Sequence, residues 1–514
     1  MFRAFLTLSG LTSVSRLLGY IRDILISNYL GASWASDAFF TGFRFPNLFR
    51  RIFGEGAFNA GFVPLFSKAL EEQGREAAVK FSNQVLSLLG IFLLAMTVLF
   101  IFKMEWLITL LAPGFKNQPE TLALATNCGK IMFSYLFCMS LTAQLGGILN
   151  TLKKFAAVGF APILLNLCFL VTLLVYIPFL KIDHNLSSIA YALSIAVCAA
   201  GFMQLSLLWV CCYKAGIRLR FAFPKITRET HELFKLIVPG ILASSVQQLN
   251  IFIGHAIASG QESAISYLYF ADRVNQLPIG IVGISYGVIL LPLISRKLSA
   301  KQPIEAQADF IDAAKKCLWI AMPAATIMLV LPYEIIHVLF YRGKFTLEDT
   351  AQTALVLQAF AVGLPFYVLN KVFQTPYFAT LDTKKPMIIS IISIIINTVL
   401  GWLWFKSHGA VGIALATSVA AGIQNISLAV FLPKPFGFTR SFYFYILKLI
   451  GLCLIFAAAL YALTPLGSQW TDLGNLLDFV FLGVWLLVAG TLYLLGSHFF
   501  KVIDVTELKK LVKK

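Results

Sequence analysis

The sequence has few charged residues. Asp, Glu, Lys and Arg make up 13% of its 514 residues, whereas 59% of the residues are hydrophobic. A soluble domain is about 25% charged and about 45–50% apolar. The shortage of charge excludes an ordinary water-soluble chain, because a single core cannot bury this much apolar surface. Lipid must therefore be the solvent for much of the molecule.

Sequence signatures of common enzymes and metal sites are also missing. The chain has no phosphate-binding G-x-x-x-x-G-K-[ST] loop, no G-x-S-x-G elbow, no H-E-x-x-H helix and no C-x-x-C pair. Its 8 cysteines lack metal-ligand spacing and are typical of small buried hydrophobic residues. We therefore predict a protein that is not an enzyme, with no catalytic residue, metal site or cofactor. Any work must then draw on the membrane potential, an ion gradient or the downhill fate of a substrate.

Long apolar runs are abundant. A spanning helix needs about 20 mainly apolar residues, and the chain holds about fourteen such runs between charged or Gly/Pro-rich breaks. The pattern predicts an all-α polytopic membrane protein. The predicted spans are 4–30, 36–66, 80–104, 121–150, 157–180, 187–212, 233–257, 263–295, 312–340, 350–378, 386–405, 409–432, 441–464 and 474–499.

The basic residues of the loops are unevenly distributed. The formal charge of +17 would suggest a nucleic-acid partner in a soluble protein. Here one alternate set of loops, with the C-terminal tail, holds most of the Lys and Arg residues. The positive-inside rule places that set in the cytoplasm, so both termini are predicted to be cytoplasmic and no nucleic-acid partner is needed. The other set holds only Lys103, Lys116, Lys181, Arg342, Lys344 and Lys406.

The two halves of the chain resemble each other at a separation of about 230 residues. The echoes always pair one predicted helix with the sixth helix after it, which preserves orientation, so the repeat is parallel. Matched segments are 64–68 with 292–296, 149–154 with 381–385, 114–115 with 343–345, and Asn166 with Asn397. The predicted parts are a six-helix lobe at 1–213, a second at 228–432, two additional helices at 440–500 and a basic tail at 501–514.

Several ionisable residues lie inside predicted spans, where each costs at least about 2.5–3.5 kcal/mol unless it faces a polar interior. Two six-helix lobes with such an interior suit a transporter whose lobes rock around a central site, rather than a channel or a scaffold. The residues are Arg16, Arg22, Asp23, Asp37, Arg44, Arg50, Arg51, Glu55, Lys130, Asp272, Arg273 and Lys371.

Helical spacing predicts how some of these groups meet. Arg51 and Glu55 are four apart and can pair on one face. Arg16 and Asp23 are seven apart and share a face, whereas the adjacent Arg22 and Asp23 are not expected to face each other.

An inward-facing cationic cluster needs an anionic ligand. Arginine stays charged when partly desolvated, and its fork matches phosphate oxygens, so a diphosphate is a natural ligand. Pro46 and nearby glycines predict that the second span is bent or broken, as in helices that line cavities. Ion pairing or an interfacial position is favoured for Arg44 and Arg51, and Lys130 and Lys371 stay open. The predicted diphosphate ligands are Arg16, Arg22, Arg50 and Arg273.

Several stretches resemble a known family. The segments "SRLLGYIRD", "PNLFRRIFGEGAF", "LAPGF", "YFADRVNQLPIG" and "FYRGKFT" are similar to those of the MurJ (MviN) lipid II flippases, within the multidrug, oligosaccharidyl-lipid and polysaccharide exporter superfamily. The resemblance implies an inner-membrane, alternating-access transporter with fourteen helices. Its implied substrate is lipid II, the undecaprenyl-diphosphate precursor of peptidoglycan. The cell-wall synthesis machinery and membrane lipids are the other expected partners, and a monomer is expected to be sufficient.

The resemblance also implies roles for individual residues. The family's essential cavity arginines fall on the four predicted diphosphate ligands, and its two acidic residues of the second helix fall on Asp37 and Glu55. The helices at 440–500 would form the groove for the polyprenyl tail. Gln276 stands where some members have glutamate, so no carboxylate is implied there. The predicted supporting or gating residues are Asp37, Glu55, Arg51, Asp23, Asp272 and Gln276.

Other functions fit the sequence less well. A flippase for another polyprenyl-diphosphate oligosaccharide would need the same arginines, and it remains the main alternative. A drug antiporter would use acidic residues in an apolar cavity, whereas the cavity predicted here is basic. A membrane enzyme of cell-wall synthesis would need a carboxylate, histidine or metal cluster at a membrane face, and the sequence offers none.

Overall fold

The structure is a computed structural model that describes residues 2–54, 57–182, 185–223, 227–467 and 475–502. It is helical throughout, with no strand in these residues. The chain divides into two compact units. Unit 1 comprises residues 1–266 and 342–345, and unit 2 comprises residues 267–341 and 346–514.

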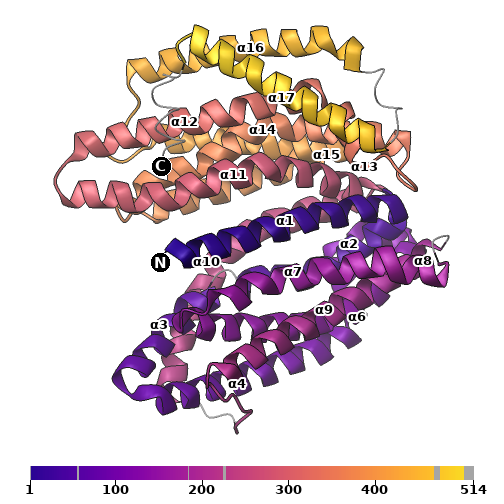
Figure 1. The fold of residues 1–514 in the computed structure, drawn as a ribbon, viewed down its shortest axis with the longest axis vertical. Coiled ribbons are helices and arrows are strands. Elements are labelled where there is room, and N and C mark those ends of the chain that lie inside the picture. Colours follow the sequence, from indigo (N-terminus) through magenta and orange to yellow (C-terminus); the bar gives the residue numbers. More distant parts are fainter. Residues whose placement is uncertain (1, 55–56, 183–184, 224–226, 468–474, 503–514) are drawn as a thin grey trace. The chain divides into compact units, whose positions relative to one another are not determined.

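Unit 1 is a bundle around α2 and α6. The α2 helix packs along α6, α6 packs against α9, and α1 lies along α7 (Figure 1). The rings of Phe39 and Phe43 stack on α2, and Phe169 of α7 meets both rings edge-on. The elements of unit 1 are α1 (Phe2–Leu30), α2 (Trp34–Gly54), α3 (Ala57–Glu72), α4 (Gly74–Phe102), α5 (Met104–Leu111), η1 (Pro113–Asn117), α6 (Pro119–Thr151), α7 (Phe155–Val171), η2 (Thr172–Tyr176), α8 (Ile177–Leu180), α9 (Leu186–Lys214) and α10 (Arg228–Ala258).

Unit 2 is built around α12, α14 and α15. The last two helices pack on this unit through α12, where the indole of Trp319 donates to Ser497 Oγ at 3.0 Å and its carbonyl accepts from Tyr493 at 2.8 Å. Figure 1 shows these helices as a separate pair along one side of the unit. The elements of unit 2 are α11 (Ala264–Ser299, whose first residues belong to unit 1), α12 (Pro303–Val330), α13 (Pro332–Phe340), α14 (Leu347–Ala379), α15 (Lys384–Val430), α16 (Arg440–Gly467) and α17 (Asn475–Phe499).

The helices follow the predicted spans closely, and the prediction of an all-helical membrane protein is confirmed. Among the described residues, nine helices are long and apolar enough to cross a membrane by length and composition.

The second predicted span is described as α2, which continues through the buried Pro46, and as α3. Residues 55 and 56 between them lie outside the described residues. The spans 386–405 and 409–432 are both found, because α15 comprises two helices that meet at Gly409, with φ 54° and ψ −137°. The two helices pack side by side, since Ser393 Oγ donates to the Ala420 carbonyl at 3.1 Å and Gln424 Nε2 donates to Ser390 Oγ at 3.0 Å. A residue with a side chain avoids this conformation, so glycine allows the chain to reverse direction there between the two helices.

The helix α10 begins the second sequence repeat but packs in unit 1. It lies against α3, where Leu233, Leu236 and Ile237 approach Gly61. A capping box formed by Thr227 and Thr230 starts the helix. The predicted lobe boundaries at 213 and 228 stay predictions, because the division into two packed units need not follow a sequence repeat.

Candidate functional site

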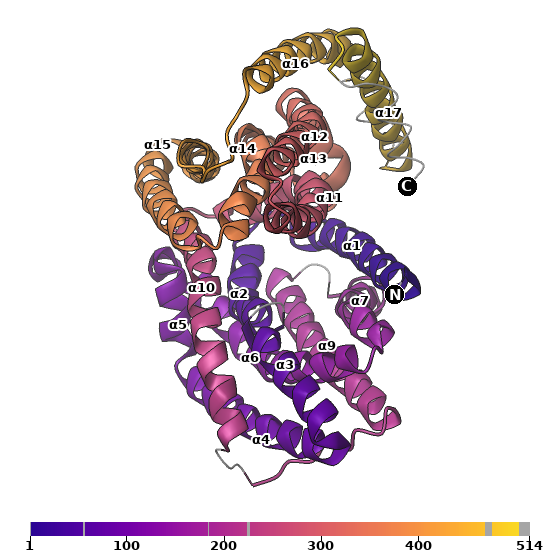
Figure 2. The ribbon, with the colours of Figure 1, turned by 90° about the vertical axis from the view of Figure 1, so that its left-hand side faces the viewer.

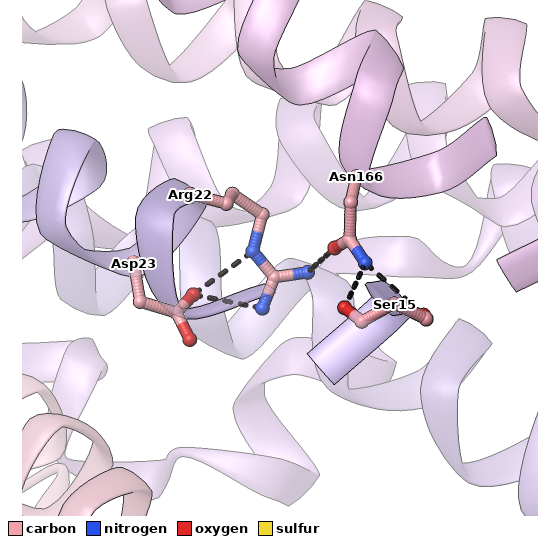
Figure 3. A network of polar contacts seen from close by, with 4 residues as sticks. All are labelled: Ser15, Arg22, Asp23 and Asn166. Carbon is pink, nitrogen blue, oxygen red and sulfur yellow. Dashed lines mark hydrogen bonds and ion pairs between the residues drawn. The ribbon is translucent and has the colours of Figure 1, made fainter. Parts of the chain in front are cut away.

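The centre of unit 1 holds a buried ion pair between neighbours on α1. Arg22 donates from Nε and Nη2 to Oδ1 of Asp23, at 2.9 and 2.7 Å (Figure 3). Arg22 is 9% exposed and Asp23 is fully buried. A charge removed from water is tolerated only with a close partner, so each side chain depends on the other.

Asn166 of α7 holds the other side of the guanidinium. Its Oδ1 accepts from Arg22 Nη1 at 3.1 Å, and its Nδ2 donates to the Ser15 carbonyl at 2.9 Å (Figure 3). The guanidinium also lies over the ring of Phe169, 5.2 Å from the centroid. Asn166 thus links two turns of α1 and fixes the direction of the arginine.

The predicted pairing on α1 is wrong in one respect. Arg22 and Asp23 do meet, although adjacent helical residues point about 100° apart. The long arginine side chain reaches its neighbour because both groups lie on the buried side of α1. Arg16, which was expected to share a face with Asp23, is exposed.

A second polar cluster joins the start of α2 to the start of α11. Asp37 is 1% exposed, and its Oδ1 accepts from the backbone N–H of Ser266 at 2.9 Å and from the Ser266 hydroxyl. Ser36 Oγ lies 2.7 Å from the same hydroxyl. Ser266 lies in the first turn of α11, where backbone N–H groups have no acceptor within their own helix. Asp37 of α2 supplies the acceptor for one of these N–H groups. The predicted position of Asp37 near the end of α2 is consistent with this capping contact.

The α2 helix is also tied to α10. Thr41 Oγ1 lies 2.9 Å from Nε2 of the buried His255, and Arg44 donates from Nη2 to the Ile251 carbonyl at 3.3 Å. Arg44 thus contacts the backbone of another helix. The ion pair or interfacial position favoured for it stays a prediction.

In unit 2, three of the predicted site residues occupy one stretch of α11. Gln276 donates from Nε2 to Asp272 Oδ2, one helical turn away. Arg273 lies beside them and is half-buried. Gln276 therefore acts as a hydrogen-bond donor to a carboxylate at the position where the resemblance offered a glutamate.

The remaining predicted residues lie outside the described side chains. Arg50 and Arg51 belong to α2, but their side chains are not described, and Glu55 is outside the described residues. Arg273 belongs to unit 2, whereas Arg16 and Arg22 belong to unit 1. The convergence of four arginines on one ligand thus stays a prediction.

A short segment of the loop between α13 and α14 packs in unit 1. The backbone N–H of Lys344 donates to the Asn28 carbonyl at the end of α1, at 2.9 Å. Gly343 has φ +57°, and a Cβ there would lie 2.2 Å from the Asn28 oxygen. Only glycine permits this approach. Residues 342–345 and α1 therefore form one packed unit, although the neighbours of the segment in the chain belong to unit 2.

Sequence reasoning missed the polar partners of the charged residues. Asn166 was noted only as part of the repeat, and Ser266 and His255 were given no role. A polar residue inside an apolar span is the signal that could have found Asn166, because a buried amide needs hydrogen-bond partners. No sequence rule brings Ser266 to Asp37 across more than 200 residues.

Comparisons with known proteins agree with this architecture. The family model "Lipid II flippase MurJ" matches residues 26–481. A relative from Rhizobium tropici, named "Probable lipid II flippase MurJ", is 39% identical over 84% of this chain and 80% of its own length. The "Lipid II flippase MurJ" of Burkholderia cenocepacia is 30% identical over 92% of both chains.

Solved structures show the same fold. The structure "Lipid II flippase MurJ, inward closed conformation" superposes with a TM-score of 0.78 at 28% identity, over 96% of this chain and 98% of that chain. An inward-facing multidrug resistance transporter of the MATE family, in the MOP superfamily, has a TM-score of 0.66 at 13% identity over 80% of this chain and 93% of its own. The expected transporter fold and the resemblance to the family are thereby confirmed, whereas the roles of the site residues stay predictions. The chain belongs to the MurJ family of lipid II flippases.

Proposed function

We propose that this chain moves lipid II from the cytoplasmic to the periplasmic leaflet of a bacterial inner membrane by alternating access. It acts as a transporter, with both termini in the cytoplasm, and it forms and breaks no covalent bond. The observation that carries the proposal is the match of residues 26–481 to the lipid II flippase family. The buried polar groups of this chain supply the physical argument for transport.

The Arg22–Asp23 pair supports a binding role that needs more than one arginine. The pair is neutral as a whole, and its two members are buried together. A diphosphate that took over the Arg22 fork would leave Asp23 uncompensated, at a cost of about 3–5 kcal/mol. Additional cations must therefore approach with the ligand. In our proposal Arg16, Arg50 and Arg273 supply them.

The Asp37–Ser266 contact suits a gate. It joins the beginnings of α2 and α11, which belong to different sequence repeats. Rocking of one repeat against the other would have to break this cap, and a ligand favours the broken state only if it binds that state more tightly. We propose that contacts between arginine and diphosphate provide this difference in affinity between the two states.

The membrane potential or an ion gradient is the proposed energy source. A potential of 100 mV is worth about 2.3 kcal/mol for each charge moved across the membrane. Collapse of the potential in cells, with ion gradients clamped, is expected to stop flipping if the potential drives it. Continued flipping would assign the role to a gradient or to the consumption of lipid II.

Depletion of the protein in its host tests the function. Lysis with accumulation of inward-facing lipid II is expected, and the wild-type chain should restore growth. The variants Arg16→Ala, Arg22→Ala, Arg50→Ala and Arg273→Ala should not restore growth at normal membrane levels, whereas the loop variant Lys153→Ala should. If all four arginine variants restore growth, the diphosphate site is elsewhere.

A flippase for another polyprenyl-diphosphate oligosaccharide is the second candidate, since a diphosphate offers the arginines the same chemistry. Unchanged lipid II turnover after depletion, together with accumulation of a different diphosphate lipid, would favour it.

A further inference from the structure

Unit 1 has a cavity of about 630 Å³ away from the Arg22 and Asp37 clusters. It lies between the first turns of α4 and the connection from α9 to α10, which Figure 2 shows running across the end of α4. The volume is in the range of small-molecule sites. The lining residues that matter here are Arg75, Lys80, Asn83, Arg218 and Phe223.

The wall formed by the connection is held in place by α4. Asn83 Oδ1 accepts from the backbone N–H of Arg220 at 2.9 Å, and Ser87 Oγ accepts from that of Ala222 at 2.8 Å. Asn83 and Ser87 are one helical turn apart, so their side chains bond the backbone of two residues that are two positions apart in an extended segment. The side chains of Ile217 and Leu219 are buried beneath it. The cavity is therefore built by specific contacts.

The cavity is basic and its cations are not neutralised. Arg75, Lys80 and Arg218 line it, against one carboxylate, Glu76. Within the described part of the chain, none of these three cations has a carboxylate at ion-pair distance. Arg75 donates from Nη2 to the Ala215 carbonyl, which leaves its other donors for a ligand.

Apolar groups stand exposed at the same place. Phe223 is 83% exposed and Phe221 is 62% exposed, and the ring of Phe221 stacks on Trp209 at 6.2 Å. Exposed aromatic rings beside basic residues are typical of the membrane–water interface. The loop charges place this end of α4 on the cytoplasmic side, where the leaflet is rich in anionic lipids.

We propose that the cavity binds the phosphodiester headgroup of an anionic phospholipid of the cytoplasmic leaflet. Arg75, Lys80 and Arg218 contact the phosphate, and Phe223 lies among the first carbons of the acyl chains. The site is separate from the proposed transport site and stands whether or not the chain carries lipid II.

Native mass spectrometry of the purified full chain tests the site. It measures binding of phosphatidylglycerol and of phosphatidylcholine with the same acyl chains, and inorganic phosphate serves as the probe for a free anion. The pocket variant is Lys80→Gln/Arg218→Gln. The matched control is Lys214→Gln/Arg220→Gln, which also removes two cations but from residues that do not line the cavity. Arg75 is kept because it supports the end of α9.

The wild type should bind phosphatidylglycerol in preference to phosphatidylcholine. The pocket variant should bind phosphatidylglycerol about 30-fold more weakly, from about 1 kcal/mol for each lost cation, and the control should change by less than about 3-fold. If the double variant does not fold, Lys80→Gln and Arg218→Gln alone should each weaken binding about 5-fold.

Equal losses in the pocket and control variants would overturn the site, because general surface charge would then explain the binding. Inorganic phosphate that binds as tightly as phosphatidylglycerol would overturn the lipid assignment and make the cavity a site for soluble anions.

Discussion

Arg22 and Asp23 illustrate how two charges inside a membrane protein depend on each other. A lone arginine or aspartate in a spanning helix costs several kcal/mol, whereas the pair with Asn166 satisfies most of its donors and acceptors. The same contacts that stabilise the fold hold the guanidinium in position. Loss of Arg22 therefore affects folding and ligand binding together, and the two effects must be separated.

The variant Arg22→Leu is expected to lower the free energy of unfolding by about 3–5 kcal/mol, because Asp23 stays buried without its cation. The double variant Arg22→Leu/Asp23→Leu should recover much of this loss, since no charge remains. Thermal unfolding in detergent measures both. A double variant that is stable and still fails to support growth would separate the binding role from folding. A double variant no more stable than Arg22→Leu would contradict the pairing argument.

Asn166 should be needed for the direction of Arg22 more than for stability alone. Asn166→Leu removes an acceptor from Arg22 and a donor to Ser15, at a cost of about 1–3 kcal/mol. Asn166→Asp keeps the acceptor, but it loses the donor to Ser15 and adds a buried charge beside a pair that is already neutral, so it should lose at least as much stability as Asn166→Leu. Thermal unfolding of both variants tests this order, and the reverse order would contradict it.

At the scale of the helices, the sequence allowed most of the fold to be predicted. Apolar runs mark the spans because lipid demands about 20 apolar residues for each crossing. The two spans that meet at Gly409 were also predicted, because the apolar run is interrupted there. The partners of Arg22 and Asp37 could not be predicted, because Asn166 and Ser266 are distant in the sequence and ordinary in type.

The variant Gly409→Ala is expected to destabilise the protein by about 1–3 kcal/mol, because an alanine there must adopt φ 54° or shift the turn between the two helices of α15. Gly483 offers a matched control inside α17, where a Cβ would meet nothing within 4 Å. Gly483→Ala should be neutral or stabilising by up to about 1 kcal/mol. Equal effects on the melting temperature would show that the turn carries no strain for alanine.

Asp37 should tolerate an amide better than an apolar residue. Asp37→Asn keeps an oxygen that can accept from the Ser266 backbone, whereas Asp37→Ala leaves that N–H buried without it, at a cost of about 0.5–2 kcal/mol. We expect Asp37→Asn to support growth of depleted cells better than Asp37→Ala. Equal failure of both variants would assign the essential role to the charge and not to the cap.

At the scale of the whole molecule, packing and sequence repeat divide the chain differently. The repeat begins again at about residue 228, but α10 packs on α3 in unit 1, and residues 342–345 join the same unit. The second half thus contributes elements to the packing of the first. Neither predicted six-helix lobe is expected to keep its native packing when expressed alone.

The proposed orientation is a property of the whole chain, because one misplaced helix would invert every later loop. Alkaline phosphatase fused after Lys116 or Lys406 should be active, since both loops are predicted to be periplasmic. Fusions after Lys153 or Lys385 should be inactive. Activity in the second pair would reverse the assignment of the termini.

The docking of residues 342–345 on α1 makes one amide a reporter of the transport cycle. The chain enters this segment from α13 and leaves it into α14, so a displacement of those helices that pulls the segment away from α1 breaks the bond between Lys344 N–H and the Asn28 carbonyl. The exchange rate of that single amide with deuterium therefore measures how often the segment is released. A slow rate that rises when substrate is added would time the opening of the transporter from a backbone position that carries no ligand.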